Sequence, residues 1–269
     1  FDKSSKLDNV LYDVRGPVVD EAARMEADGL SILKLNIGNP APFGFNAPEE
    51  VILDMRQSLW ECQGYSDSKG LFSARKAIMQ YCQLKKIPGV TMDDIYTGNG
   101  VSELINLSMQ ALLNDGDEIL IPAPDYPLWT ATATLAGGKV VHYICDEESD
   151  WNPDIADIRS KITDKTKAIV IINPNNPTGT YVPIGELEAF ADTLPEDVLL
   201  VMDEAYMEFA TEPDCCSMVD YMKAHPEKPI LVLRTFSKYY AMAGLRVGYA
   251  LGSEELIGIM RKCSASWNL

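Results

Sequence analysis

The sequence has few of the residues that bind structural metal ions, and its basic residues are outnumbered by acidic ones. It contains two histidines, His142 and His225, far apart in the chain, and six cysteines, none of which forms a C-x-x-C pair. This set does not match a zinc site, so no metal is expected. The 23 basic and 40 acidic side chains give a net charge of -17, which argues against nucleic acid or an anionic membrane as a partner.

Long apolar runs are also lacking. No run approaches the ~20 residues of a membrane span, no signal peptide is recognisable, and Phe1 in place of Met leaves open a missing N-terminus. Scattered cysteines without a disulfide framework fit a reducing compartment, so we expect a cytoplasmic protein. A chain of 269 residues with 46% hydrophobic and 23% charged residues can bury a large core and is typical of a soluble globular protein.

Short apolar runs alternate with amphipathic segments along the chain. The predicted strands are residues 33–37, 118–122, 140–145, 167–172, 198–202, 230–233 and 246–251, with a further strand that ends before Gly98, and the predicted helices are residues 17–27, 48–60, 71–84 and 151–162. The run at 167–172 is apolar enough for a parallel strand covered on both faces. This alternation predicts an α/β fold.

One lysine follows a predicted strand and lies in a polar turn. Lys238 comes shortly after the hydroxyls of Thr235 and Ser237, and Arg246 follows eight residues later. Partial burial lowers the pKa of a lysine and exposes the free amine, which can form a Schiff base. An arginine can bind a phosphate through two parallel hydrogen bonds. The window suits a phosphate-bearing cofactor held covalently, and it also leaves open a surface lysine on a loop.

A second motif combines glycines with the start of a helix. Gly98 and Gly100 lie between a strand end and a helix that has Ser102 near its N-cap. The first N–H groups of a helix have no partners within it and sit at the positive end of the helix dipole, so they can hold a phosphate. No third glycine follows at the spacing of dinucleotide-binding proteins, so that class is excluded.

Further polar side chains stand at strand ends, where open parallel sheets bind ligands. The amide of Asn176 can donate and accept hydrogen bonds at once. The carboxylate of Asp203 can pair with a protonated pyridine nitrogen. Tyr126, held between prolines, can stack on a flat ring, although a packed loop aromatic is the alternative. We interpret Glu204 as structural, and the next acidic residues as a solvated loop. These residues are Glu208, Glu212 and Asp214.

Taken in order, these motifs resemble those of pyridoxal-phosphate (PLP) aminotransferases of class I/II, fold type I. The matching segments are Thr-Phe-Ser-Lys at 235–238, Gly-Leu-Arg-Val-Gly-Tyr at 244–249 and Asn-Pro-Asn-Asn-Pro-Thr-Gly at 173–179. The resemblance covers essentially the whole chain. It implies PLP as the cofactor, a mostly parallel sheet with helices on both faces, and a homodimer.

The resemblance also implies a role for each matching residue. Lys238 binds PLP as a Schiff base and then moves a proton as general base and acid, Asp203 pairs with the ring nitrogen, and Tyr206 donates to the ring hydroxyl. Asn176 contacts that hydroxyl and the substrate carboxylate, which Gly38 covers. The other cofactor-binding residues are Gly100, Val101, Ser102, Tyr126, Ser237, Arg246 and, from the neighbouring subunit, Tyr65, with Thr235 and Trp129 close by.

The resemblance differs between two parts of the chain. Residues 1–179 resemble bacterial alanine (glutamate–pyruvate) aminotransferases, whereas residues 198–262 resemble histidinol-phosphate aminotransferases. We expect an enzyme that moves an amino group between an amino acid and a 2-oxo acid, with L-alanine and 2-oxoglutarate as the first choice. A histidinol-phosphate aminotransferase, a PLP lyase on the same fold and an inactive truncated fragment remain alternatives.

Three regions are expected along the chain. Residues 1–35 form an N-terminal arm and helix, residues 36–252 form the large PLP-binding domain, and residues 253–269 begin an interdomain helix. Proteins of this family continue for on the order of a hundred residues beyond such a point. We therefore expect the C-terminal small domain, which carries the family's carboxylate-binding arginine, to be missing from this chain.

Overall fold

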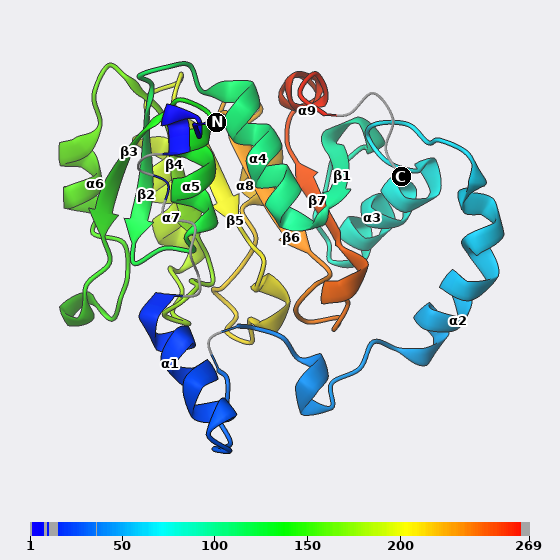
Figure 1. The fold of residues 1–269 in the computed structure, drawn as a ribbon. Helices are drawn as coiled ribbons and strands as arrows, with labels where there is room; N and C mark the ends of the chain where they lie inside the picture. The colour runs from blue at the N-terminus through cyan, green and yellow to red at the C-terminus, as the bar shows by residue number, and fades with distance from the viewer. Residues whose placement is uncertain (1, 8–9, 11–15, 36, 265–269) are drawn as a thin grey trace.

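The structure, a computed structural model, describes residues 2–7, 10, 16–35 and 37–264, and its centre is a seven-stranded sheet (Figure 1). The strands are β1 Ile95–Asn99, β2 Glu118–Ala123, β3 Lys139–Ile144, β4 Thr166–Ile172, β5 Leu199–Asp203, β6 Ile230–Thr235 and β7 Val247–Leu251. Their spatial order is β1-β7-β6-β5-β4-β2-β3, in which β7 is antiparallel to both neighbours and the other pairs are parallel. The predicted mostly parallel sheet is confirmed.

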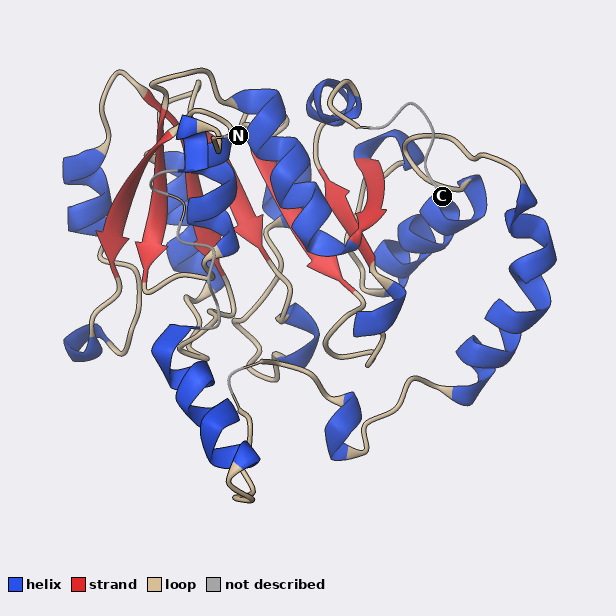
Figure 2. Cartoon of the chain, in the orientation of Figure 1, coloured by secondary structure: helices blue, strands red, loops and turns tan. Residues whose placement is uncertain are grey.

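Helices cover both faces of the sheet (Figure 2). The helices of the described chain are α1 Gly16–Ala27, α2 Glu49–Ser58, α3 Phe72–Leu84, α4 Gly100–Leu112, α5 Leu128–Leu135, α6 Ile155–Lys161, α7 Ile184–Asp192, α8 Val219–Ala224 and α9 Glu254–Arg261. Successive strand residues point to opposite faces. Leu199 and Val201 therefore pack with α4, α5 and α9, whereas Leu200 and Met202 pack with α3, α6, α7 and α8. Within the described ranges, no helix has both the length and the apolar character that crossing a membrane requires.

The strand predicted at residues 33–37 is wrong for the part of it that the structure describes. Leu33, Leu35 and Ile37 are exposed and belong to no strand. A strand needs a neighbouring edge to pair with, and this segment instead runs past the carboxyl ends of the sheet strands. There it brings Gly38 next to the side chain of Lys238.

Two predicted helix boundaries also need correction. The helix predicted at 151–162 begins only at Ile155, because Trp151 has a positive φ of 60°. Asp154 caps the helix, and its carboxylate accepts a hydrogen bond from the N–H of Asp157 at 2.9 Å. Ser102 is the third residue of α4, because β1 runs directly into the helix at Gly100. Part of the helix predicted from residue 253, residues 265–269, lies outside the described residues.

The N-terminal region packs differently from the sheet and its helices. No residue of α1 or α2 is buried, and both stand apart from the helices that cover the sheet (Figure 1). Many of the large apolar side chains here are exposed, among them Trp60 at 81% and Leu35 at 74%. The core of the structure therefore begins with α3, in which Ile78 and Cys82 are buried.

Candidate active site

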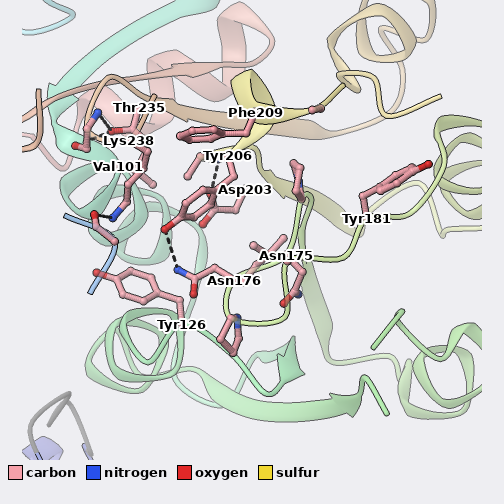
Figure 3. A pocket seen from close by; sticks show the side chains of 18 of the residues that line it. Val101, Tyr126, Asn175, Asn176, Tyr181, Asp203, Tyr206, Phe209, Thr235 and Lys238 are labelled. Atoms are coloured by element: carbon pink, nitrogen blue, oxygen red, sulfur yellow. Dashed lines mark hydrogen bonds between the residues drawn. The ribbon is translucent and has the colours of Figure 1, made fainter. Parts of the chain in front are cut away.

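Polar side chains gather at the carboxyl ends of β4, β5 and β6 around a pocket of about 950 Å³ (Figure 3). Parallel strands bring these ends to one edge of the sheet, and the loops that follow them supply the side chains. The volume lies near the upper end of the range typical of ligand sites, about 300–1,000 Å³. Among the residues that line it are Gly38, Val101, Ser102, Tyr126, Asn176, Asp203, Tyr206, Thr235, Ser237, Lys238 and Arg246.

Lys238 enters the pocket from the turn after β6. Its Nζ donates a hydrogen bond to the carbonyl oxygen of Gly38 at 2.9 Å and lies 5.7 Å from the ring centroid of Tyr206. Burial lowers the pKa of Lys238, and the charge of Arg246 lowers it further, while Asp203 opposes both. A lowered pKa increases the share of neutral amine near pH 7, and the neutral amine is the form that attacks a carbonyl carbon.

Asp203 is the last residue of β5 and is 4% exposed. Its Oδ2 accepts a hydrogen bond from the indole Nε1 of Trp129 at 3.1 Å, and its Oδ1 accepts one from the N–H of Ala205 at 3.1 Å. Burial nevertheless raises the pKa of Asp203 to about 6. Two hydrogen bonds do not replace the lost hydration, so the carboxylate would gain from a cationic partner in the pocket.

An anion-binding corner forms where α4 begins. Gly100 has a φ of 73°, and a Cβ built on it would overlap the guanidinium of Arg246, so only glycine fits here. The first N–H groups of α4 have no acceptor within the helix and lie at its positive end. Together with the guanidinium they can hold a phosphate.

The hydroxyls of Thr235 and Ser237 also line the pocket. The Thr235 hydroxyl donates to the Ser237 Oγ at 2.9 Å, and the N–H of Ser237 donates to the Thr235 Oγ1 at 3.1 Å. These two contacts fold the chain into a tight turn just after β6. The turn places Ser237 and the following Lys238 on the pocket side of the strand end.

The side chains of Asn176 and Tyr206 contact each other in the pocket. The Nδ2 of Asn176 donates to the hydroxyl of Tyr206 at 3.5 Å, and Figure 3 shows Asp203 close behind this pair. Burial raises the pKa of Tyr206, and the nearby Asp203 and Tyr126 raise it further. The phenol therefore stays protonated at neutral pH and can donate a hydrogen bond.

The structure brings almost all of the residues predicted for the cofactor and substrate to this one pocket. Gly100 borders it through its contact with Arg246. Tyr65 does not line it; its side chain is 80% exposed in the turn that follows α2. The contact predicted for Tyr65 is with a neighbouring subunit, and it stays a prediction, as do the individual roles assigned to the other residues.

Some features of the site were not predicted. The hydrogen bond from Trp129 to Asp203 depends on the packing of α5 against β5, which a sequence motif does not show. Asn175 is buried and accepts hydrogen bonds from the N–H of Thr178 at 3.2 Å and from its hydroxyl at 2.8 Å, which fixes the turn that carries Asn176. The doubled asparagine is the signal that could have pointed to it. No motif marked Tyr181, Thr211 and Cys215, which also line the pocket.

The interpretation of Glu208 as part of a solvated loop is wrong. Its side chain is 15% exposed. The carboxylate accepts hydrogen bonds from the guanidinium of Arg234 at 3.1 Å and from the hydroxyl of Tyr81 at 2.5 Å. Glu212 and Asp214 are exposed, as expected.

Comparisons with known proteins agree on one family. The family model for aminotransferase class I and II matches residues 31–269. A glutamate-pyruvate aminotransferase (AlaA) of Haemophilus influenzae is 53% identical over 252 residues, which are 93% of this chain and 62% of the relative. A histidinol-phosphate aminotransferase of Carboxydothermus hydrogenoformans is 38% identical over 264 residues, 98% of this chain and 68% of the relative. The crystal structure of an aminotransferase from Escherichia coli has a TM-score of 0.88 at 49% identity, covering 97% of this chain and 66% of that one.

The chain belongs to the class I and II aminotransferases. The predicted family and the predicted fold type are thereby confirmed. The match to each class of relative covers more than nine tenths of the chain, so neither match is confined to one of the two parts. The chain spans 62% of the length of the Haemophilus relative.

The pocket fits the cofactor of this family, pyridoxal 5′-phosphate. Among the described residues, the buried carboxylate of Asp203 accepts hydrogen bonds from the indole of Trp129 and the N–H of Ala205, neither of which is cationic. A pyridinium nitrogen would supply a cationic partner. Gly100 leaves room for Arg246 at the helix start, where a phosphate could bind. Lys238 provides a partly buried amine between these two ends. Among the described residues, no group of three or more His, Cys, Asp or Glu side chains could hold a metal ion.

Proposed function

We propose that the protein is a PLP-dependent aminotransferase that moves an amino group from L-alanine to 2-oxoglutarate. The observation that carries this proposal is the convergence of Lys238, Asp203 and Arg246 on one pocket. A covalent anchor, a ring-nitrogen partner and a phosphate ligand are three separate requirements of this cofactor. The family match and the name of the Haemophilus relative, a glutamate-pyruvate aminotransferase, support the choice of reaction and substrates.

Each residue then has a distinct task. When bound, PLP supplies a conjugated ring that accepts the electron pair of the substrate's Cα–H bond. Lys238 would anchor the cofactor, and its Nζ, as a free amine, would take a proton from the substrate's Cα as general base and give it back as general acid. Asp203 would hold the pyridine nitrogen in its protonated form. Tyr206 and Asn176 would bind the ring hydroxyl, and Tyr126 would pack against the ring face.

The remaining groups orient the ligands. Arg246, Ser237 and Thr235 bind the phosphate together with the backbone N–H groups of residues 100–102. Gly38 lies beside Lys238 and Tyr206, with a Cβ built on it 3.1 Å and 3.0 Å from their polar atoms. The loop that carries Gly38 therefore covers the side on which the substrate carboxylate would bind.

The assembly and location are part of the same proposal. We place the protein in the cytoplasm as a homodimer in which Tyr65 reaches the phosphate of the neighbouring subunit. The exposed position of Tyr65 and the six free cysteines support this arrangement. The division into residues 1–35, 36–252 and 253–269 also stays a proposal.

A histidinol-phosphate aminotransferase is the second candidate, supported by the match to the Carboxydothermus relative. The two candidates share the cofactor-binding residues and differ in the amino donor. A lyase on the same fold would act on an amino acid without an oxo acid acceptor. The products formed with each donor and acceptor therefore separate the three.

The test combines absorbance with product analysis. The protein is titrated with PLP, reduced with borohydride and digested, so that the modified peptide identifies the lysine. L-Alanine or histidinol phosphate is then added to unreduced protein with and without 2-oxoglutarate. We expect a visible absorbance band, modification at Lys238, and glutamate formed from L-alanine only when 2-oxoglutarate is present.

Matched variants complete the experiment. Lys238→Ala should lose the band and at least about 10²-fold in rate. Lys262→Ala changes an exposed lysine just after the end of α9 and should behave as wild type. Modification at another lysine would overturn the assignment of Lys238. Products formed without an acceptor would show a lyase, and transfer only from histidinol phosphate would show the second candidate.

A further inference from the structure

A buried ion network lies directly behind the pocket, on the other face of β5 and β6. The Nε and Nη2 of Arg234 donate to the Oε2 of Glu204 at 2.9 and 2.8 Å, and the Nη1 donates to the Oε1 of Glu208 at 3.1 Å. The side chain of Arg234 is 7% exposed and that of Glu204 is fully buried. An ion pair at this depth is maintained only when its hydrogen-bonding groups are satisfied.

The carboxylate of Glu204 has partners on both oxygens. Besides Arg234, its Oε2 accepts from the hydroxyl of Ser217 at 2.8 Å and its Oε1 accepts from the N–H of Met218 at 2.9 Å. Burial opposes the charge of Arg234, but Glu204 and Glu208 raise its pKa above the usual value. The arginine is therefore permanently charged and can hold both carboxylates in one geometry.

Strand alternation connects this network to the pocket. Asp203 is the last residue of β5 and Glu204 follows it directly, whereas Arg234 and Thr235 are the last two residues of β6. Successive strand residues face opposite ways, so Asp203 and Thr235 line the pocket while Glu204 and Arg234 join behind it. The two strand ends are also joined by the N–H of Glu204, which donates to the carbonyl of Leu233 at 2.9 Å.

The network reaches two more parts of the site. Glu208 lies two residues after Tyr206, which lines the pocket. The hydroxyl of Tyr81 on α3 donates to Glu208 at 2.5 Å. Tyr240, two residues after Lys238, is the other hydrogen-bond partner of Tyr81. The segments that carry Asp203, Tyr206 and Lys238 thus all connect to one buried cluster.

We propose that Arg234 is a positioning residue of the active site: by binding Glu204 and Glu208 it fixes the backbone segments that present Asp203 and Tyr206 to the cofactor. Arg234 does not line the pocket. It acts through its neighbours, in the way that residues hydrogen-bonded to metal ligands orient those ligands at metal sites. This inference rests on the proposed PLP-dependent function and adds a residue outside the family motif used above.

The experiment compares two network variants in the complete protein loaded with PLP. Arg234→Lys keeps the charge but loses the fork that binds two carboxylates. Tyr81→Phe removes one hydroxyl at the edge of the network and keeps the packing. The measurements are the PLP dissociation constant from the visible absorbance, the visible circular dichroism of the bound cofactor, and the melting temperature.

Matched controls remove the same kinds of bond elsewhere. Arg75→Lys alters a buried arginine that donates to the carbonyls of Gly70 and Met92. Tyr221→Phe removes a hydroxyl that donates to Asp192 at 2.6 Å. Neither control residue lines the pocket.

We expect Arg234→Lys to raise the PLP dissociation constant about tenfold. This is the lower end of the loss of affinity seen at metal sites when a residue hydrogen-bonded to a metal ligand is changed. The circular dichroism per bound cofactor should fall, because the ring is held less firmly. Tyr81→Phe should change both in the same direction by a smaller factor, and the controls should lower only the melting temperature. If Arg234→Lys and Tyr81→Phe lower the melting temperature but leave the dissociation constant and the circular dichroism as in wild type, the inference is wrong. A wild-type protein without a visible band would contradict the proposed function itself.

Discussion

The two faces of the β5–β6 strand pair carry buried charged groups in opposite states. On the pocket face, burial raises the pKa of Asp203 to about 6 and lowers the pKa of Lys238, so both groups shift toward their neutral forms. On the other face, Glu204 and Arg234 bind each other at 2.8 Å and have further partners. One strand pair thus has a face whose charges are incompletely paired and a face whose charges are fully paired.

The difference shows how a rigid scaffold can hold a reactive site. Desolvated charges without partners are unfavourable, and they persist only when the surrounding structure fixes them. Here Glu204 of the paired network directly follows Asp203 in the chain. Arg234 directly precedes Thr235, where the turn that carries Lys238 begins. A ligand with a cationic ring nitrogen and an anionic phosphate would complete the pocket face. The two faces should therefore respond in opposite ways when a charged group is removed.

The largest effect on stability is expected from Glu204→Ala on the paired face. The change leaves Arg234 buried with one carboxylate partner and strands the N–H of Met218. Removing one member of a buried ion pair typically costs about 3–5 kcal/mol. The free energy of unfolding from urea titration measures this loss.

The control is Glu186→Ala, because Glu186 is exposed on α7. We expect this surface change to alter the free energy of unfolding by no more than about 0.5 kcal/mol. Equal losses in both variants would mean that the network contributes no more than an exposed carboxylate.

The opposite sign is expected for Asp203→Asn on the pocket face of the cofactor-free protein. Well below the unfolded-state pKa of about 3.9, the carboxyl is protonated in the folded and the unfolded states. As the pH rises to about 6, the folded wild type retains the proton more strongly than the unfolded chain does, so this part of its stability is lost. Asparagine does not titrate, so the variant should be more stable than wild type by about 3 kcal/mol at pH 8.

Urea titrations of both proteins at pH 4 and pH 8 measure this difference. The advantage of the variant should shrink toward pH 4, which serves as the internal control, and the variant should lose most of its transamination rate. A variant that is less stable than wild type at pH 8 would show that Asp203 is well paired in the folded protein.

The sequence was most informative where one physical effect dominates. The apolar runs of β4 and β5 predicted buried parallel strands, because a strand that is apolar on both faces needs helices covering both sides of its sheet. The strand predicted at 33–37 failed because apolar composition does not provide a pairing edge. The sequence did not predict helices α5, α7 and α8. They have only six to nine residues, which is too short for a clear repeat of apolar residues along one helix face.

The sequence likewise predicted some residues of the site but not the contacts that depend on packing. Motifs placed Lys238, Asp203 and Arg246 in one pocket. Asp203 ends β5, Lys238 follows β6, and Arg246 precedes the antiparallel β7, so all three lie at one edge of the sheet. The bond from Trp129 to Asp203 and the pair of Arg234 with Glu204 could not be read from the sequence. They depend on which face of the sheet each side chain takes and on which helix covers it. An arginine inside the apolar run of β6 was the available signal, because such a charge needs a buried partner.

A smaller effect is expected from Trp129→Phe, which changes the pairing of Asp203 without changing its charge. The indole N–H is one of two hydrogen bonds that lower the pKa of Asp203 against the effect of burial. Its loss should raise that pKa further and cost about 1 kcal/mol for the hydrogen bond, in addition to a packing loss. The pH range over which the cofactor-free protein loses stability should therefore extend above pH 6.

Urea titrations from pH 4 to pH 8 measure this range. Trp151→Phe is the control, because Trp151 is a loop tryptophan that does not line the pocket. The same pH dependence in Trp129→Phe and wild type would show that the indole does not set the state of Asp203.

The smallest effect on stability is expected from Gly38→Ala, although the change touches the reactive lysine. Gly38 is exposed, and a Cβ built there would lie 3.1 Å from the Nζ of Lys238 and 3.0 Å from the hydroxyl of Tyr206. The loop can shift by a few tenths of an ångström, so unfolding should change by no more than about 0.5 kcal/mol. The carbonyl that accepts from Lys238 moves with the loop, so the rate of labelling of Lys238 by an amine-reactive reagent should change.

Gly64→Ala in the same N-terminal region is the control, because a Cβ there meets no atom within 4 Å. Unchanged labelling in Gly38→Ala would show that the pocket face tolerates a displaced partner, which would weaken the contrast between the two faces.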